Sequence, residues 1–138
     1  MAEFVDHFKD TFNRLNARNL ELLEQIYSPQ VSFRDPVHAI QGLPALRAYY
    51  ARLYKDVVSC RFDFEDEVIA DGRCALVWIM RFEHASFCRG QQLSLRGVSH
   101  LKFSDKVWHH EDFFDMGAFI YEKVSVLGGI VRAIKRRL

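Results

Sequence analysis

The hydrophobic pattern changes its period once along the chain, near residue 59, and this change restricts the possible folds more than any other feature. Before it, apolar residues recur with helical spacing: those between Phe4 and Leu15 stand at i, i+4, i+8 and i+11. After it, apolar and charged residues alternate around Phe62 and Phe64. A period near 3.6 predicts an amphipathic helix, and a period of two predicts a strand with one buried face.

The first half of the chain predicts three helices and one strand. The first helix covers residues 4 to 15, and a second short helix follows Asn19 as N-cap and stops at Pro29. A strand is expected at residues 31 to 34. The third helix starts near Pro44, because proline suits a first turn whose N–H has no partner, and continues to about residue 57.

The second half predicts four strands and a closing helix. The tripeptide "DGR" at 71 to 73 is typical of a hairpin turn, and "CALVWIMRFE", "LSLRGVSHLKF" and "VWHHEDFFDM" are strand-like. The closing helix is expected from about Val124. We therefore expect a single α+β domain over residues 1–138, in which a strongly curved antiparallel sheet wraps around the N-terminal helices.

Composition excludes several classes of protein. The 19 basic and 18 acidic residues nearly cancel, so no strong overall field favours nucleic acid. The N-terminus lacks the pattern of a secretory signal, and no stretch approaches the ~18 apolar residues of a membrane span. Cys60, Cys74 and Cys88 form no C-x-x-C pair, which argues against a disulfide framework or a zinc site. We expect a cytoplasmic protein with buried cysteines.

The segment "VSFRDPVHAIQG", residues 31–42, places Asp35 beside Pro36 where a strand ends. Asp in such a position often accepts backbone N–H bonds in a turn, which is one interpretation. In the other, the carboxylate lines an apolar pocket, where burial would raise its pKa toward a range useful for proton transfer. His38, in the same loop, is expected near the mouth of that pocket.

The last predicted strand carries a second group of polar side chains. Alternation in "HHEDFFD" puts His110, Asp112 and Phe114 on one face, and with Trp108 they resemble a half-apolar pocket wall. The alternative is a hydrogen-bonded polar pair on a solvated face. Neighbouring ligand-type residues point apart, and no phosphate loop or dinucleotide motif is present. We therefore expect neither a metal nor a cofactor.

The element order, together with "RDPV", a following glycine and the helical pattern A-x-R-x-x-Y at 45–50, resembles the nuclear transport factor 2-like superfamily. That superfamily includes the SnoaL-like polyketide cyclases and the ketosteroid isomerases. The resemblance spans residues 3 to about 116, and is specific only at 27–54 and 98–103. The last strand and "YEKVSVLGGIVRAIKRRL" resemble a bacterial SnoaL-like subgroup of mainly uncharacterised proteins. The resemblance implies a cone-shaped, cystatin-like α+β barrel with an extra C-terminal helix.

The resemblance also implies roles for individual residues. Asp35 falls where the isomerases hold the carboxylate that removes a proton alpha to a ketone. Tyr27 and Tyr50 fall where some of them keep a tyrosine network supporting the oxyanion hole. The two strong donors of that hole would fall at or next to Thr11 and at Ser99, so both are missing. Losing one such donor typically costs about 2.7–4 kcal/mol, so steroid isomerisation itself is not expected.

The preferred hypothesis is a cofactor-independent isomerase, cyclase or dehydratase-type lyase that acts on a small, largely apolar carbonyl compound. Cavity carboxylates and histidines serve as general acid and base in the resembling cyclases. Here Asp35 would be the general base, His110 the proton donor or oxyanion stabiliser, and Asp112 the residue that orients His110. The residues expected to shape the pocket are Phe33, His38, Tyr50, Trp78, Ser99, Leu101 and Phe114.

Two alternatives remain open. The first is a non-catalytic module that binds a ligand or serves as a dimeric scaffold. The second is an activity like that of an epoxide hydrolase, in which Asp35 and Asp112 activate water. That chemistry needs an arginine between the carboxylates, so Arg81 or Arg96 would have to face inward.

The expected partners are a small apolar ligand and a second copy of the chain. Val77, Ile79 and Val98 give the outer face of the sheet enough apolar surface to favour a homodimer. The C-terminal segment from Leu127 to Leu138 has a basic amphipathic pattern that fits an anionic membrane surface, but such helices more often dock on their own domain or on a partner subunit.

Overall fold

The structure, a computed structural model, describes residues 1–86, 90–115 and 136. Cys88 lies outside the described residues, and so does most of the helix that was predicted to begin near Val124. None of the described helices is long and apolar enough to cross a membrane. The elements are α1 (Ala2–Arg14), η1 (Leu20–Leu22), α2 (Leu23–Ile26), β1 (Tyr27–Arg34), β2 (Ala39–Gln41), α3 (Leu43–Tyr54), β3 (Val57–Ala70), β4 (Arg73–His84), β5 (Leu93–Phe103) and β6 (Val107–Phe114).

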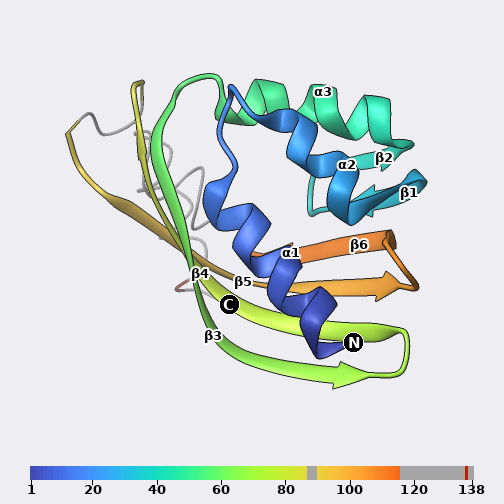
Figure 1. Ribbon diagram of the computed structural model, residues 1–138. Helices are drawn as coiled ribbons and strands as arrows, with labels where there is room; N and C mark the ends of the chain where they lie inside the picture. Colours follow the sequence, from blue (N-terminus) through green and yellow to red (C-terminus); the bar gives the residue numbers. More distant parts are fainter. Residues whose placement is uncertain (87–89, 116–135, 137–138) are drawn as a thin grey trace.

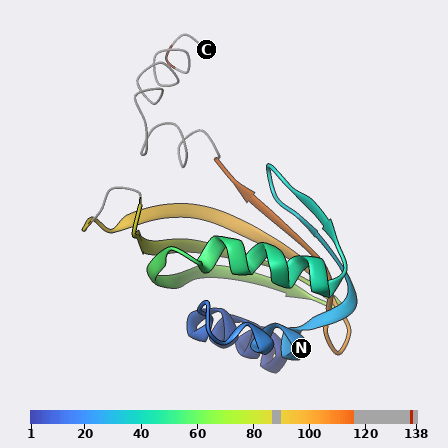
Figure 2. The same cartoon turned by 90° about the horizontal axis from the view of Figure 1, so that it is seen from above.

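The described strands form one sheet in the order β2-β1-β6-β5-β4-β3, strongly curved, with α1 and α3 on its concave side (Figures 1 and 2). The α+β class is confirmed, but the sheet is mixed. β1 pairs with β6 in parallel, whereas the other neighbours are antiparallel. The meander that was predicted from the alternation is β3 to β6. The short strand β2 was not predicted, because three residues are too few to show a period.

The apolar faces of α1 and α3 meet over the concave side of the sheet. Phe8 and Phe12 of α1 are buried, as the helical spacing predicted, and Val5 of the same helix is buried as well. On α3, Leu46 is fully enclosed. Burying a side chain of this size typically contributes about 1.5–3 kcal/mol, so these helices are held on the sheet mainly by their apolar faces.

Trp108 does not lie on the cavity side, contrary to the prediction from strict alternation. It lies at an irregularity in the β5–β6 pairing, where Val107 pairs with Phe103 and His109 pairs with Lys102. One extra residue in a strand breaks the alternation of faces at that point. The indole of Trp108 is therefore 48% exposed, beneath the Lys102 ammonium group.

Gly97 makes room for the other tryptophan. Gly97 on β5 pairs with Trp78 on β4, and a Cβ atom added to Gly97 would lie 2.5 Å from the indole. Real Cβ contacts are never this short, so the glycine allows the Trp78 ring to lie flat across β5. The indole N–H then reaches the Ser99 hydroxyl, 2.9 Å away.

Candidate functional site

A cavity of about 320 Å³ lies between the concave side of the sheet and the helices α1 and α3. Its wall is built mainly from aromatic rings. The aromatic residues that line it are Phe8, Phe12, Phe33, Tyr49, Tyr50, Tyr54, Phe62, Phe64, Trp78, Phe82 and Phe114. Its described polar side chains are Asp35, His38, Cys60, His84, Ser99, His110 and Asp112. The size and the few polar groups are those of a site for a small, mostly apolar molecule.

Asp35 lies in the cavity wall with its carboxylate fully engaged. Oδ1 accepts hydrogen bonds from the backbone N–H groups of Val37 at 2.8 Å and His38 at 2.7 Å. Oδ2 accepts the Tyr49 hydroxyl at 2.5 Å. The His38 ring lies 3.3 Å from Oδ1. This carboxylate therefore caps the 35–38 turn and also faces the cavity, so features of both interpretations of this residue are present.

The pKa of Asp35 shifts opposite to the sequence-based expectation. Burial alone would raise it, but the hydrogen bonds from Tyr49 and from the Val37 and His38 backbone stabilise the charged form more, and the pKa is lowered. The same contact, together with burial, raises the pKa of the Tyr49 hydroxyl. A carboxylate with a lowered pKa is a weak base, so this environment does not favour proton abstraction by Asp35.

The second polar centre is a continuous chain of hydrogen bonds across the inner wall. His110 Nε2 lies 2.6 Å from Asp112 Oδ1, and the same oxygen accepts the Ser99 hydroxyl at 2.5 Å. On the other side of the ring, His110 Nδ1 lies 2.6 Å from the Tyr27 hydroxyl. Tyr27 in turn lies 3.3 Å from the Tyr50 hydroxyl. The chain thus joins β1, α3, β5 and β6.

The chemistry of the groups fixes the direction of most of these bonds. The Trp78 indole N–H can only donate, so Ser99 accepts from it and donates to Asp112. Ionised Asp112 can only accept, which makes His110 Nε2 the donor. Among the described residues, none bonds to Asp112 Oδ2, and 18% of this side chain is exposed. Asp112 is itself one of the residues that line the cavity.

His110 is held on every side by rings. Its side chain is 3% exposed and contacts Phe8 and Phe12 of α1 and Phe33 of β1 at ring centroid distances of 5.0–6.4 Å. Its ring also stacks on Tyr27. The imidazole therefore has a fixed orientation, set by packing and by a hydrogen bond at each nitrogen.

Nearly all of the residues predicted for the pocket line the cavity. Phe33, His38, Tyr50, Trp78, Ser99 and Phe114 do so, together with Asp35, His110 and Asp112. Leu101 does not: its side chain is completely enclosed in the core and is not among the lining residues. Leu101 lies on the same face of β5 as Ser99 but two residues further along the strand, within the buried core cluster.

Tyr49 is the main residue that the sequence reasoning missed. It donates to Asp35 and lines the cavity. Its signal was its spacing, since Tyr49 stands three residues after Leu46 and so lies on the buried face of α3. The lining residues Tyr54, Cys60 and Phe62 were also missed. Burial raises the pKa of the Cys60 thiol to about 11, so it lines the wall as a neutral group.

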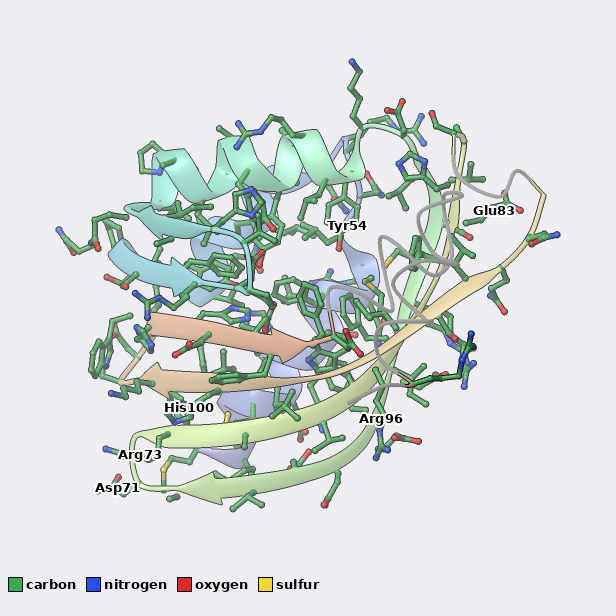
Figure 3. The ribbon with its side chains drawn as sticks, turned by 180° about the vertical axis from the view of Figure 1, so that it is seen from behind. Tyr54, Asp71, Arg73, Glu83, Arg96 and His100 are labelled. Atoms are coloured by element: carbon green, nitrogen blue, oxygen red, sulfur yellow. The ribbon has the colours of Figure 1, made fainter. Side chains whose placement is uncertain are left out.

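The arginines required by the epoxide-hydrolase alternative do not face inward. Arg81 Nε pairs with Asp63 at 2.6 Å, and Arg96 Nε pairs with Glu65 at 3.2 Å. Figure 3 looks onto the outer face of the sheet and shows Arg96 there. Because the side chains of Arg81 and Arg96 alternate with the inward-facing residues of β4 and β5, they belong to that outer face.

A metal centre finds no support within the described ranges. No group of three or more His, Cys, Asp or Glu side chains there is placed to hold an ion. His109 and Glu111 lie on the outer face, and desolvation by burial, aided by the Lys102 charge, lowers the pKa of His109. Cys74 is buried and Cys60 is half-buried, and both are free thiols.

Comparison with known proteins gives a family and a fold. A family model described as a SnoaL-like domain matches residues 8–110. Comparison with curated proteins gives no match. An NTF2-like protein of unknown function from Burkholderia pseudomallei is 16% identical, with a TM-score of 0.76 over 91% of this chain and 97% of its own.

Two further structures are similar. A putative SnoaL-like polyketide cyclase from Jannaschia sp. is 16% identical, with a TM-score of 0.75 over 91% of both chains. A protein with a ketosteroid isomerase-like fold from Catenulispora acidiphila, in complex with trimethylamine, is 10% identical, with a TM-score of 0.71 over 92% of both chains. At these identities the similarity shows a common fold.

Proposed function

Because the chain belongs to the SnoaL-like domain family, we propose that it is a cofactor-independent acid–base enzyme acting on a small, largely apolar carbonyl compound. The observation that carries this proposal is the Asp112–His110 pair in the wall of an aromatic cavity. A carboxylate beside an oriented imidazole can take a proton from a carbon next to a carbonyl group and return it elsewhere. Isomerisation, ring closure and elimination of water all need such a transfer.

Asp112, rather than Asp35, is the general base in this proposal. No hydrogen bond from a described residue reaches its Oδ2, whereas the Asp35 carboxylate has four contacts that hold its pKa down. The His110 N–H and the Ser99 hydroxyl fix the orientation of Asp112 through Oδ1. Asp35 then has a positioning role: it secures the 35–38 turn at one side of the cavity.

The aromatic wall favours a flat ligand. Phe62 contacts both Phe12 and Trp78 edge to face, at ring centroid distances of 5.8 and 5.5 Å, and all three rings line the cavity. A volume of about 320 Å³ is at the small end of the range for ligand pockets, about 300–1,000 Å³. The substrate class that fits is a fused-ring ketone of two or three rings. The putative polyketide cyclase among the similar structures is consistent with ring-bearing substrates.

The fluorescence of Trp78 can be used to measure ligand binding. The chain has two tryptophans, so the substitution Trp108→Phe leaves the cavity indole as the single reporter. We expect 2-tetralone and 2-naphthol to quench its fluorescence saturably, and Trp78→Phe to remove the signal. A Trp108→Phe protein that shows no saturable response to either compound would contradict the proposed ligand class. Saturable binding without any proton transfer would favour the alternative, a non-catalytic ligand-binding module.

We also propose that the chain forms a homodimer through the outer face of the sheet. Val77, Val98 and Phe113 lie side by side on β4, β5 and β6, and Phe113 is 52% exposed. A lysine at position 98 would place a charge in the middle of this row, so Val98→Lys is expected to convert the dimer to a monomer. Size-exclusion chromatography with light scattering measures both states. A monomeric wild-type protein would refute the dimer.

A further inference from the structure

The two tyrosines beside His110 can change the direction of their hydrogen bonds. While the His110–Asp112 pair holds a single shared proton at Nε2, His110 Nδ1 has a lone pair and accepts the Tyr27 hydroxyl. Tyr27 then uses its own oxygen to accept the Tyr50 hydroxyl. In this state both hydroxyl protons are directed along the wall toward His110, and Tyr50 offers the cavity only an oxygen lone pair.

One added proton reverses this direction. Because Nε2 already carries hydrogen, a second proton on the His110 ring can only be on Nδ1, which then donates to the Tyr27 oxygen. The Tyr27 hydroxyl must then turn to Tyr50, because its oxygen now accepts from His110. The Tyr50 hydroxyl loses its acceptor and is free to donate into the cavity, which Tyr50 lines.

We propose that His110, Tyr27 and Tyr50 form a proton-coupled relay in which Tyr50 becomes the hydrogen-bond donor to the ligand oxygen when His110 gains a proton at Nδ1. This inference rests on the proposed function, since it assigns the donor to the ketone oxygen while Asp112 takes the proton from carbon. It also supplies a donor in place of the two oxyanion donors that are replaced here by Thr11 or Phe12 and by Ser99.

The relay conserves protons through one turnover. Asp112 Oδ2 takes the proton from the carbon next to the ketone, the C–H electron pair moves into the new carbon–carbon double bond, and the carbonyl oxygen gains the negative charge. Nδ1 already carries hydrogen before this step, so Tyr50 donates to that oxygen. Transfer of the Tyr50 proton to the oxygen, of the Tyr27 proton to Tyr50 and of the Nδ1 proton to Tyr27 gives the enol, with Asp112 protonated and His110 neutral. Return of the Asp112 proton to carbon, and of the enol proton through Tyr50 and Tyr27 to Nδ1, restores the starting network.

The surroundings of the relay suit this role. Burial raises the pKa of both Tyr27 and Tyr50 well above that of an ordinary phenol, so both remain protonated and act through their hydroxyl protons. Among the residues that the structure describes, the ionisable side chains that face His110 are Tyr27 and Asp112, with Tyr50 behind Tyr27. The neighbouring side chains of α1 and β1 are the phenyl rings of Phe8, Phe12 and Phe33.

Tyr54 supplies a matched control. It is a buried tyrosine in the same wall, with its ring centroid 6.3 Å from that of Tyr50, but its hydroxyl interacts with Cys60 rather than with the relay. The substitution Tyr54→Phe therefore removes a hydroxyl from the same helix and the same cavity without breaking the path from His110 to Tyr50.

The test measures proton uptake when 4-nitrophenolate binds, by calorimetry in buffers of different ionisation enthalpy, with the visible absorption of the ligand as a second readout. Wild type is expected to take up about one proton per bound anion, and Tyr54→Phe is expected to keep this stoichiometry whatever its affinity. Tyr27→Phe is expected to bind without uptake, because Tyr50 can then donate freely. Tyr50→Phe is expected to lose affinity by about ten- to a hundredfold, as for the loss of one hydrogen bond to a charged group.

The outcomes separate the relay from the function on which it rests. Uptake that is absent in wild type, or unchanged in Tyr27→Phe, would overturn the relay while leaving an acid–base cavity in place. Equal loss of affinity in all three tyrosine variants would also overturn it, since that would indicate a purely structural role. Failure of every aromatic probe to bind would overturn the proposed function, and the relay with it.

Discussion

Asp112→Asn is expected to slow proton transfer on a bound ketone by about 10²–10⁴-fold, the usual contribution of a positioned general base. The amide keeps an oxygen that can accept from Ser99 and His110, so the fold and the cavity are retained, but it cannot take a proton. The rate is measured as exchange of the α-protons of 2-tetralone for deuterium in D2O, followed by NMR. No natural substrate is needed.

Asp35→Asn is the matched control for this assay, because it neutralises the other cavity carboxylate. We expect its exchange rate to stay within a few-fold of wild type wherever the protein is folded. If Asp35→Asn abolished exchange while Asp112→Asn left it unchanged, the assignment of the base would be wrong. The expectation drawn from the isomerase resemblance, with Asp35 as base, would then be restored.

The second large effect is on stability. Asp35→Asn is expected to lower the free energy of unfolding at neutral pH by about 2–3 kcal/mol, because the Tyr49 hydroxyl and two backbone N–H groups lose a charged acceptor. The pKa of Asp35 is lower in the folded state than the ~3.9 of an unfolded chain. The stabilisation is therefore fully present above the unfolded pKa and is lost as the pH falls through the folded pKa.

Urea denaturation between pH 7 and pH 2.5 measures this dependence. The difference between wild type and Asp35→Asn is expected to be constant above about pH 5 and to shrink below about pH 4. Asp56→Asn, at an exposed position, serves as the control for loss of one surface charge. A difference that grows as the pH falls would mean that the pKa of Asp35 is raised by burial, as first expected.

Hydrophobic spacing predicted the elements because most of them have one buried face. The stripe of α1 and the alternation of β3 to β6 both follow from that requirement. The parallel pairing of β1 with β6 could not be read in the same way. It joins segments that are 77–80 residues apart in the sequence, and no local turn or hydrophobic period indicates it. Trp108 shows the same limit on a smaller scale, since one irregularity reverses the face of a single side chain.

The sequence indicated which side chains line the cavity better than it indicated how they bond to one another. The alternation of side chains along the strand placed His110, Asp112 and Phe114 on one face of β6, and all three line the cavity. The hydrogen bonds were not predictable, because Tyr49 lies 14 residues after Asp35 and Tyr27 lies 83 residues before His110. A pKa depends on such contacts as well as on burial, so the direction of the Asp35 shift required the structure.

The central claim is that a ketone bound in the aromatic cavity loses a proton to the Asp112–His110 pair. It is tested most directly by measuring deuterium exchange of 2-tetralone by the wild-type protein while 2-naphthol is added. We expect exchange well above the buffer rate, and inhibition with the same dissociation constant that 2-naphthol shows by quenching of Trp78. Exchange no faster than in buffer, or exchange unaffected by saturating 2-naphthol, would contradict it.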